Sequence, residues 1–362
     1  MTEFILPKDY LILLLNKAFR YGRKILRIKE PFYGLDLFTV DEKMRISKIV
    51  SGREFREERD KVVHGLGRLD WEAPEWFDFK DCFLSSGALR PREWDDFVEQ
   101  IHHIRARMTG PSRPRKPVYI GIDTNVAYSR IFSRHFPYVG HEEINPDCLE
   151  LVVSELVRKE VDRRIGYRYK PDEVEALSSR ARARGLVRRL GRTNKLSTRK
   201  AKLAQNEIDF LTKDLGALEV SGRDLAKDKE RVDRDMAASY ADFQESHSAE
   251  VILVTFDQNM VDHAKNARLS TAVMRFPVNE ALGAIDNPWS LHCLIHDLAV
   301  IFGVVQLSPL DIHVWGEWQG KQTEDYEFER VKIDIGESIP FLDKFTKQAE
   351  RCGKIIESMR ED

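Results

Sequence analysis

The hydrophobic and polar positions alternate most regularly in the middle of the chain, where short apolar runs are followed by amphipathic stretches. Four runs read as strands, and they are 118–122, 149–153, 250–255 and 272–276. Apolar residues at helical spacing predict helices beginning near residue 154, over 232–243 and over 258–268. Strands that alternate with helices predict a parallel sheet, and the fold class is therefore α/β.

The regions on either side of this pattern are less regular. Residues 1–110 predict a mostly helical N-terminal region, and the Pro- and Gly-rich stretch 111–117 predicts a linker. The sheet domain is expected over 118–277. Residues 278–362 predict a small α+β region, which is either an appended domain or the surface of a homo-oligomer. Within it His292 and His296 are four residues apart, and core or solvated histidines are a more common explanation than a metal pair.

A long insertion, 166–229, interrupts the sheet domain and is expected to form a basic helical hairpin. Its middle carries ten basic residues and no acid between residues 180 and 202. They are Arg180, Arg182, Arg184, Arg188, Arg189, Arg192, Lys195, Arg199, Lys200 and Lys202. A charge run is often only a solvated face, but a run of one sign repels itself, and that favours contact with nucleic acid.

Composition places few limits on function. The chain has 362 residues, 42% of them hydrophobic and 33% charged, with a net charge of −2, which predicts a globular protein with a real core. The cysteines are Cys82, Cys148, Cys293 and Cys352. They form no CxxC pair, so a reducing compartment is expected. Residues 11–15 are too short an apolar run for a signal core or membrane span, and a cytoplasmic protein without a membrane partner is expected.

Four acids stand at related places in the strand–helix pattern. Asp123 follows the first strand, where a residue can reach a ligand at the carboxyl edge of the sheet, although most such Asp residues only cap the next helix. Glu160 shares the apolar face of its helix, whereas Glu155 lies about 140° away. Asp233 lies on the packed face of its helix, and we expect Asp235 and Asp242 nearer the opposite face. Asp257 follows the strand 250–255.

These segments resemble the four motifs of PIN domain nucleases. The residues Asp-Thr-Asn-Val at 123–126 resemble the first motif, and Val-Ser-Glu-Leu-Val-Arg-Lys-Glu-Val at 153–161 resembles the second, with Glu160 as its acid. Val-Asp-Arg-Asp-Met-Ala-Ala-Ser-Tyr-Ala at 232–241 resembles the third, and Val-Ile-Leu-Val-Thr-Phe-Asp at 251–257 the fourth. The resemblance covers about residues 117–277 and implies a three-layer PIN-like domain. The long basic insertion departs from a compact PIN domain.

The resemblance implies a metal-dependent endoribonuclease that hydrolyses phosphodiester bonds of structured RNA. Its catalytic and metal-binding residues would be Asp123, Glu160, Asp233 and Asp257, which would hold Mg²⁺ or Mn²⁺. Crowded carboxylates also need a cation, and hard divalent ions prefer oxygen ligands. Thr124, Asn125 and Thr255 would position the carboxylates or the scissile phosphate. The alternative is a catalytically inactive PIN-fold protein that binds RNA or acts as a scaffold.

Overall fold

The chain divides into two compact units, each built from separate stretches of sequence. The computed structural model describes residues 2–21, 24–108, 116–135, 150–222, 226, 228–277, 283, 285, 287–336, 339, 341–348 and 351. Unit 1 consists of Met1–Ala88, Tyr167–Leu196 and Glu280–Asp362. Unit 2 consists of Leu89–Gly166 and Ser197–Asn279. The expected linker falls almost entirely outside the described residues, as do Cys148 and Cys352.

Unit 1 is built on a seven-stranded antiparallel sheet in the order β1-β12-β11-β10-β2-β3-β4. Its strands are β1 (Thr2–Pro7), β2 (Ile25–Lys29), β3 (Asp36–Asp41), β4 (Ile46–Ser47), β10 (Val304–Ser308), β11 (Ile312–Trp315) and β12 (Arg330–Ile335). The first strand of the chain pairs with the last, Thr2 opposite Ile335. Strands β10 and β11, together with β12, supply the β part of the α+β region expected over 278–362.

The helices of unit 1 come from the two chain ends and from the insertion. They are α1 (Tyr10–Arg20), α2 (Gly52–Val63), η1 (Gly67–Glu72), α3 (Trp76–Ser85), α8 (Pro171–Arg180), α9 (Arg184–Arg188), η4 (Pro288–Ser290), α13 (Leu291–Phe302) and α14 (Thr323–Glu327). Helix α13 is buried on every side and packs on α3, β10 and β11. The aromatic cluster of 71–83 contributes Trp76, Phe79 and Phe83 to this core, whereas Trp71 and Phe77 are exposed.

This unit corrects two expectations about the chain ends. The N-terminal region is not mostly helical in its first part, because β1, β2, β3 and β4 lie there. The N- and C-terminal regions are not separate either, because β12 pairs with β1 and β10 pairs with β2. The reason is that antiparallel pairing between distant strands depends on partners that no local pattern records.

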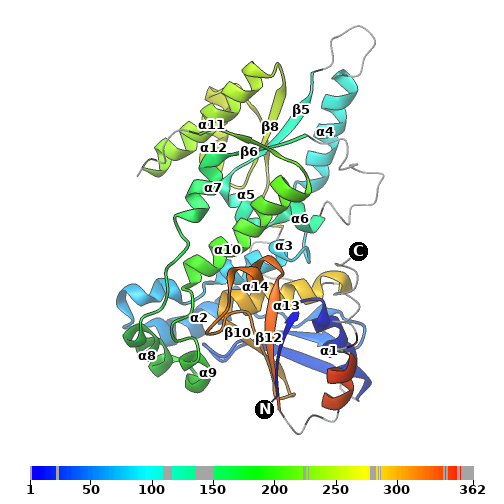
Figure 1. Cartoon of the computed structure of the whole chain (residues 1–362), viewed down its shortest axis with the longest axis vertical. Coiled ribbons are helices and arrows are strands. Elements are labelled where there is room, and N and C mark those ends of the chain that lie inside the picture. The colour runs from blue at the N-terminus through cyan, green and yellow to red at the C-terminus, as the bar shows by residue number, and fades with distance from the viewer. Residues whose placement is uncertain are drawn as a thin grey trace. The chain divides into compact units, whose positions relative to one another are not determined.

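Unit 2 contains a five-stranded parallel sheet in the order β7-β6-β5-β8-β9 (Figure 1). Its strands are β5 (Val118–Ile122), β6 (Glu150–Ser154), β7 (Leu218–Val220), β8 (Glu250–Thr255) and β9 (Ser270–Val273). The chain as a whole is therefore mixed α/β, with the expected parallel sheet. The last strand ends at Val273, three residues before its predicted end.

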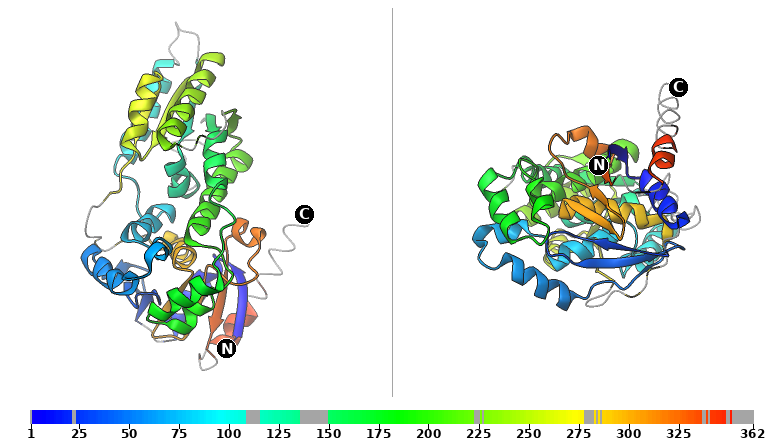
Figure 2. Two further views of the ribbon diagram at one scale, coloured as in Figure 1. Left: turned by 90° about the vertical axis from the view of Figure 1, so that its left-hand side faces the viewer. Right: turned by 90° about the horizontal axis from the view of Figure 1, so that it is seen from below.

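The helices of unit 2 follow the predicted alternation. They are α4 (Trp94–Met108), α5 (Thr124–Ser129), α6 (Ile131–His135), α7 (Glu155–Asp162), α10 (Leu196–Asp209), η3 (Phe210–Asp214), α11 (Lys229–Ser246) and α12 (Gln258–Asn266). Helix α11 contacts β6, β7 and β8, and α12 packs beside it on β8 and β9, as the left view of Figure 2 shows for the two helices. The buried faces of both helices join one core with the strands.

The insertion does not form a projecting hairpin. Helices α8 and α9 belong to unit 1, whereas α10 supplies Ala201, Ala204 and Ile208 to the core of unit 2. The strand β7 at its end pairs with β6, so the insertion is also not wholly helical. A basic composition hid this division, because the buried alanines of α10 are scattered among charged residues.

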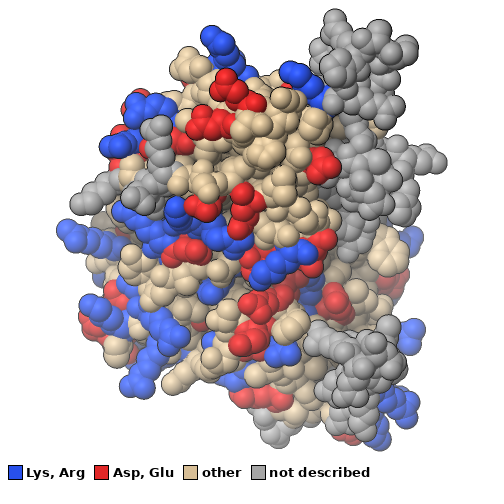
Figure 3. Space-filling model, turned by 45° about the horizontal axis from the view of Figure 1, so that its top comes forward, with Lys and Arg blue, Asp and Glu red and all other residues tan. Residues whose placement is uncertain are grey.

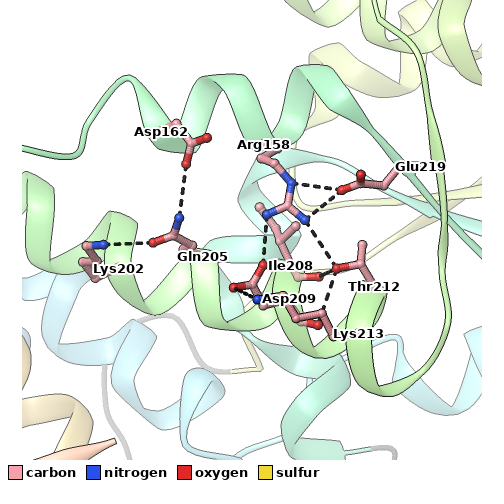
Figure 4. Close-up of polar contacts among 9 residues, drawn as sticks. All are labelled: Arg158, Asp162, Lys202, Gln205, Ile208, Asp209, Thr212, Lys213 and Glu219. Carbon is pink, nitrogen blue, oxygen red and sulfur yellow. Dashed lines mark hydrogen bonds and ion pairs between the residues drawn. The ribbon is translucent and has the colours of Figure 1, made fainter. Parts of the chain in front are cut away.

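A network of side chains joins α10 to the helix that carries Glu160 (Figure 4). Arg158 on α7 donates to Asp209 at 2.9 Å and to Glu219 on β7 at 2.7 Å. Its guanidinium also donates to Thr212 at 3.3 Å. Arg158 lies two residues before Glu160, roughly 200° around the helix. One face of α7 is therefore held by α10 and β7, and Glu160 points elsewhere.

Among the described residues, no helix combines the length and apolar character that a membrane crossing requires.

Candidate active site

The central strands β5 and β8 bring two of the predicted acids to one edge of the parallel sheet. After β5 the chain continues to β6 and β7 on one side, and it then returns to form β8 and β9 on the other. The strand order therefore reverses between β5 and β8, and ligands bind at such switch points in α/β sheets. Asp123 directly follows β5, and Asp257 lies two residues after β8.

Asp123 is buried, with 2% of its surface exposed, and both of its carboxylate oxygens are hydrogen-bonded. Oδ1 accepts from the Val126 N–H at 2.8 Å, which caps α5, and Oδ2 accepts from the Thr255 hydroxyl at 2.5 Å. The capping role considered for Asp123 is therefore real. The bond from Thr255 adds a contact across two strands that capping does not require.

Glu160 is linked to the Asp123 region by Thr124, the residue that follows Asp123. The Thr124 hydroxyl donates to Glu160 Oε2 at 2.6 Å. Glu155 instead accepts from Lys159 at 3.1 Å, one turn along its own helix. The burial of Leu156, Val157 and Val161 on the same helix agrees with the predicted phase. Asn125, which was expected to position a phosphate, has an exposed side chain.

Asp233 lies on the packed side of α11, as predicted, with 8% of its surface exposed. Asp235 was expected nearer the opposite face, but it is buried to the same degree, at 6%. The buried face of α11 is wide enough to cover both residues, because the buried Ser239, Val232 and Met236 lie between Asp235 and Asp233 around the helix. Asp242 is exposed, as expected.

Asp257 is held by its own turn and by a lysine. Its backbone N–H donates to the Thr255 hydroxyl at 2.8 Å, and its Oδ1 caps α12 by accepting from the Asn259 N–H at 2.9 Å. The other oxygen, Oδ2, accepts from Lys229 Nζ at 3.2 Å. Thr255 thus links Asp123 and Asp257 through one hydroxyl, which donates to the first residue and accepts from the second.

The acids affect one another electrostatically. The pKa of Asp123 is raised to about 7, chiefly by burial; the hydrogen bonds from Thr255 and Val126 oppose the rise, and the charges of Asp257 and Asp233 add to it. Burial also raises the pKa of Asp233, which Lys229 opposes and the charges of Glu160 and Asp257 reinforce. The four predicted acids are therefore close enough to form one electrostatic cluster.

Three residues to which the sequence reasoning gave no role at the site support this cluster from behind. Tyr240 is buried and donates its hydroxyl to Ile122 O at 2.6 Å, while it accepts from the Ser154 N–H at 3.0 Å. Ser154 also shares a 2.9 Å hydrogen bond with Ser239. Tyr240 therefore ties the ends of β5 and β6 to α11. The signal in the sequence is Gly121, because a Cβ there would lie 3.0 Å from the Tyr240 ring.

Lys229 is the fourth functional residue that the sequence reasoning missed. It begins α11 four residues before Asp233, and its ammonium contacts Asp257. Burial alone would lower the pKa of Lys229, but the hydrogen bond and charge of Asp257 outweigh that effect and raise it. The sequence could have indicated this residue, because a lysine four positions before an acid on a helix is placed to interact with it.

The donor set of this cluster fits a hard divalent cation. The cluster has four carboxylates, and among the described residues Lys229 is the one lysine shown to contact them. Negative charge therefore remains in excess. Carboxylate oxygens are the ligands that Mg²⁺ and Mn²⁺ prefer. The side chains are not gathered around one point, because no three of these acids place donor atoms within 4.8 Å of one another. Cation binding would therefore require side-chain rotation, with Glu160 leaving Thr124 or Asp257 leaving Lys229.

A second group of donors satisfies that distance criterion, and it lies in unit 1. Among the described residues, His296, Asp297 and Glu329 place donor atoms within 4.8 Å of one another and could hold an ion by position. His296 is the second histidine of the pair His292 and His296; it is a buried core residue, as the commoner explanation has it, and it shares a 2.8 Å hydrogen bond with Asp297.

Charge favours the carboxylate cluster of unit 2 over this second group. Lys8 already forms an ion pair with Glu329. The pKa of His296 is lowered to about 3, chiefly by burial, and the charges of Lys8 and Lys321 lower it further. Lys8 therefore already pairs with one of the two carboxylates of this group, and Lys321 adds positive charge near His296, so a divalent ion would meet positive charge there. The carboxylates of unit 2 keep negative charge in excess.

The predicted nucleic-acid-binding residues separate into different kinds of position. Seven of them, from Arg180 to Lys195, belong to unit 1, and three, Arg199, Lys200 and Lys202, belong to unit 2. Arg199 is only 2% exposed, so it lies in the core instead of on a binding surface. By helical phase Arg199 shares a face of α10 with the buried Leu203 and Glu207, on the side away from the core alanines, so this helix is buried on more than one face.

Several of the other basic residues are paired with acids that the sequence window did not contain. Arg188 pairs with Glu175 at 2.7 Å, and Lys195 pairs with Glu173 at 2.7 Å. Arg189 donates to the fully buried Asp334 at 2.7 Å and lies over the Trp315 ring. Figure 3 shows Lys and Arg side chains interspersed with Asp and Glu on the visible face. Arg184 and Arg192 are exposed.

The chain matches no family model, no curated protein and no solved structure in the three comparisons. The resemblance to PIN domains therefore rests on the motif residues and on the geometry described above.

Proposed function

We propose that unit 2 is a metal-dependent nuclease with a three-layer PIN-like fold, and that it hydrolyses phosphodiester bonds of RNA as an endoribonuclease. The observation that carries the proposal is the Thr255 hydroxyl, which joins Asp123 and Asp257 at the switch point of the parallel sheet. This strand-end threonine bonds the carboxylate of Asp123 and the backbone N–H of Asp257, which packing alone does not require. Glu160 and Asp233 add two further acids to the same edge.

The residues that would hold Mg²⁺ or Mn²⁺ are Asp123, Glu160, Asp233 and Asp257. A hard divalent ion supplies neutralisation of the carboxylates and activates water for attack on phosphorus. Asp123 is fixed on the backbone by Val126 and Thr255, so it would bind the ion with little loss of side-chain entropy. Glu160 and Asp257 would adjust around it, because Thr124 on Glu160 Oε2 and Lys229 on Asp257 Oδ2 are exchangeable partners.

The chain's own residues also orient the site. Thr255 fixes the orientation of the Asp123 carboxylate through its bond to Oδ2, and Tyr240 ties the ends of β5 and β6 to α11. Arg158 anchors α7 from its far side, so the position of Glu160 is set by a charged network and not by one contact. Rigid support of this kind is what a reactive constellation needs.

The choice of nucleic acid as substrate rests on the basic residues of the insertion, and the choice of RNA rests on the resemblance to PIN domain nucleases. The exposed Arg184 and Arg192 are suited to phosphate contacts, because guanidinium groups bind phosphate through paired N–H donors. These contacts would supply affinity, whereas the carboxylates would perform the cleavage.

Incubation of the purified protein with Mn²⁺ and a panel of structured RNA, single-stranded RNA and DNA tests the proposal. We expect cleavage of structured RNA that stops on chelation with EDTA and is lost in Asp123→Asn. Equal cleavage by the variant would show that the activity does not come from this site.

One observation favours a second function, a catalytically inactive RNA-binding or scaffold protein. The acids are not gathered within 4.8 Å, and Lys229 occupies Asp257. A protein of that class would bind RNA without cleaving it and would bind Mn²⁺ no more tightly than Asp123→Asn does. Calorimetric titration of Mn²⁺ into both proteins separates the two functions without an activity assay.

A further inference from the structure

Lys229 is the cation that the carboxylate cluster already contains. Its Nζ lies 3.2 Å from Asp257 Oδ2, and the charges of Asp233 and Glu160 act on the same ammonium. These acids come from α11, α7 and the turn before α12. Among the described residues, no other lysine or arginine has a hydrogen bond or ion pair with any of the four acids. His263 influences Asp233 only as a distant charge.

The ion pair of Lys229 is built so that it can open. The lysine side chain is 67% exposed, while the Asp257 side chain is 17% exposed. An ion pair with one solvated partner contributes little free energy, because water compensates the ammonium when it leaves. A divalent ion carries twice the charge of the ammonium, and binding it does not immobilise a lysine side chain. It therefore competes with the ammonium for the same Asp257 oxygen.

We propose that Lys229 is a resident counter-cation that a divalent ion displaces, and that the displaced ammonium then binds a phosphate of the nucleic-acid substrate at the entrance to the site. The inference rests on the proposed function. Lys229 occupies the first position of α11, where backbone N–H groups also favour anions. A lysine is a compact point charge on a flexible stem, which suits a residue that exchanges between a carboxylate and a phosphate.

The chain offers a matched control in Lys213. It pairs with Asp209 at 3.1 Å, its side chain is 68% exposed, and that of Asp209 is 21% exposed. The geometry and exposure of this pair match those of Lys229 and Asp257, but it lies among the residues of Figure 4 that hold α7 and not among the four acids. Replacing either lysine with Gln removes one positive charge from the chain, so an effect of net charge alone would be the same in the two variants.

The first measurement is calorimetric titration of Mn²⁺ into the full chain. Lys229→Gln should bind Mn²⁺ roughly three- to ten-fold more tightly than the wild type, because the competing ammonium is gone. Lys213→Gln should bind it as the wild type does, and Lys229→Arg should restore competition. Equal affinities in Lys229→Gln and Lys213→Gln would overturn the displacement.

The second measurement is binding of a structured RNA in the presence of Ca²⁺, with RNA integrity checked on a gel. Lys229→Gln should bind RNA roughly three- to ten-fold more weakly, with a salt slope reduced by about one unit. Tighter Mn²⁺ binding with unchanged RNA affinity would overturn the phosphate contact. Failure of the proposed function can be told apart from failure of this inference. If the carboxylates are not a metal site, Asp123→Asn would keep the Mn²⁺ affinity of the wild type, whatever the lysine variants do.

Discussion

The Thr255 hydroxyl donates a 2.5 Å hydrogen bond to Asp123 Oδ2, although the two residues are 132 positions apart in the chain. The parallel register of β5 and β8, with Ile122 opposite Val254, brings the two strand ends together. Because the same hydroxyl accepts from the Asp257 N–H, one side chain relates the first acid of the cluster to the last. The predictions below follow from that arrangement.

Asp123→Asn should abolish divalent-dependent cleavage while the fold is kept. The amide can still accept from the Val126 N–H, and its NH₂ group can donate to Thr255, so both native contacts have a substitute. We expect activity to fall on the order of 100-fold or more and Mn²⁺ binding to be lost. Cleavage assays and calorimetry measure both. Glu329→Gln in unit 1 is the control. If this variant loses Mn²⁺ binding, the metal site is the group of His296, Asp297 and Glu329 and not the carboxylate cluster of unit 2.

The metal-free protein should lose stability as pH rises toward neutrality. The pKa of Asp123 is raised to about 7 in the folded protein, whereas the unfolded carboxyl titrates near its ordinary value of 3.8. The folded state therefore holds more protons between these values, and stability falls with rising pH across that window. The penalty at pH 8 is of the order of a few kcal/mol.

Chemical unfolding of wild type and Asp123→Asn at pH 5 and pH 8, in EDTA, tests this expectation. The variant should be more stable than the wild type at pH 8, and the difference should shrink at pH 5. A difference independent of pH would mean that Asp123 does not titrate in this range. Added Mn²⁺ should remove the pH dependence in the wild type.

Glu160 and Glu155 should behave differently although both lie on α7. Glu160→Gln removes an acid of the cluster that is held by Thr124, and it should lower cleavage sharply and weaken Mn²⁺ binding roughly 10- to 100-fold. Glu155→Gln removes only an exposed pair with Lys159, and it should change stability by less than about 0.5 kcal/mol. Mn²⁺ titration of both variants decides between them, and loss of metal in Glu155→Gln would reverse the assignment.

The basic residues of the insertion should separate into binding and structural positions. The double substitution Arg184→Ala and Arg192→Ala should weaken RNA binding and flatten its salt dependence by roughly one unit per lost phosphate contact. Arg189→Ala should instead lower the free energy of unfolding by about 1–3 kcal/mol, because buried Asp334 loses a charged donor. An unchanged salt dependence of RNA binding in the double variant would show that these exposed arginines are only solvated and do not contact RNA.

Tyr240→Phe should destabilise unit 2 by about 1–3 kcal/mol, because the Ser154 N–H and the Ile122 carbonyl both lose a buried partner. Chemical denaturation measures the effect. Phe243, three residues further on α11, provides a control for aromatic packing without such bonds: Phe243→Leu should cost about as much as other changes of buried hydrophobic volume. If Tyr240→Phe is neutral, the hydroxyl does not hold the strand ends.

The sequence by itself determined the elements of unit 2. The apolar runs predicted β5, β6 and β8 to within a residue, and helical phase correctly put Asp233 on a packed face and Glu160 on the half-buried edge of its helix. The reason is that the helix-covered part of the parallel sheet leaves a strong local pattern, with buried strands and half-buried helices, whereas α10 and β7 of the insertion left none. The strand-end positions of Asp123 and Asp257 follow from that pattern directly.

Only the tertiary structure decided which distant residues are partners. The pairing of β1 with β12, the acids that neutralise Arg188, Arg189 and Lys195, and the burial of Arg199 all depend on segments far apart in the chain. Counting charges along the sequence cannot predict them, because side-chain pairing is set by distance in space. The same is true of the lysine at the carboxylate cluster. Its contact with Asp257 arises when α11 and the end of β8 pack against each other.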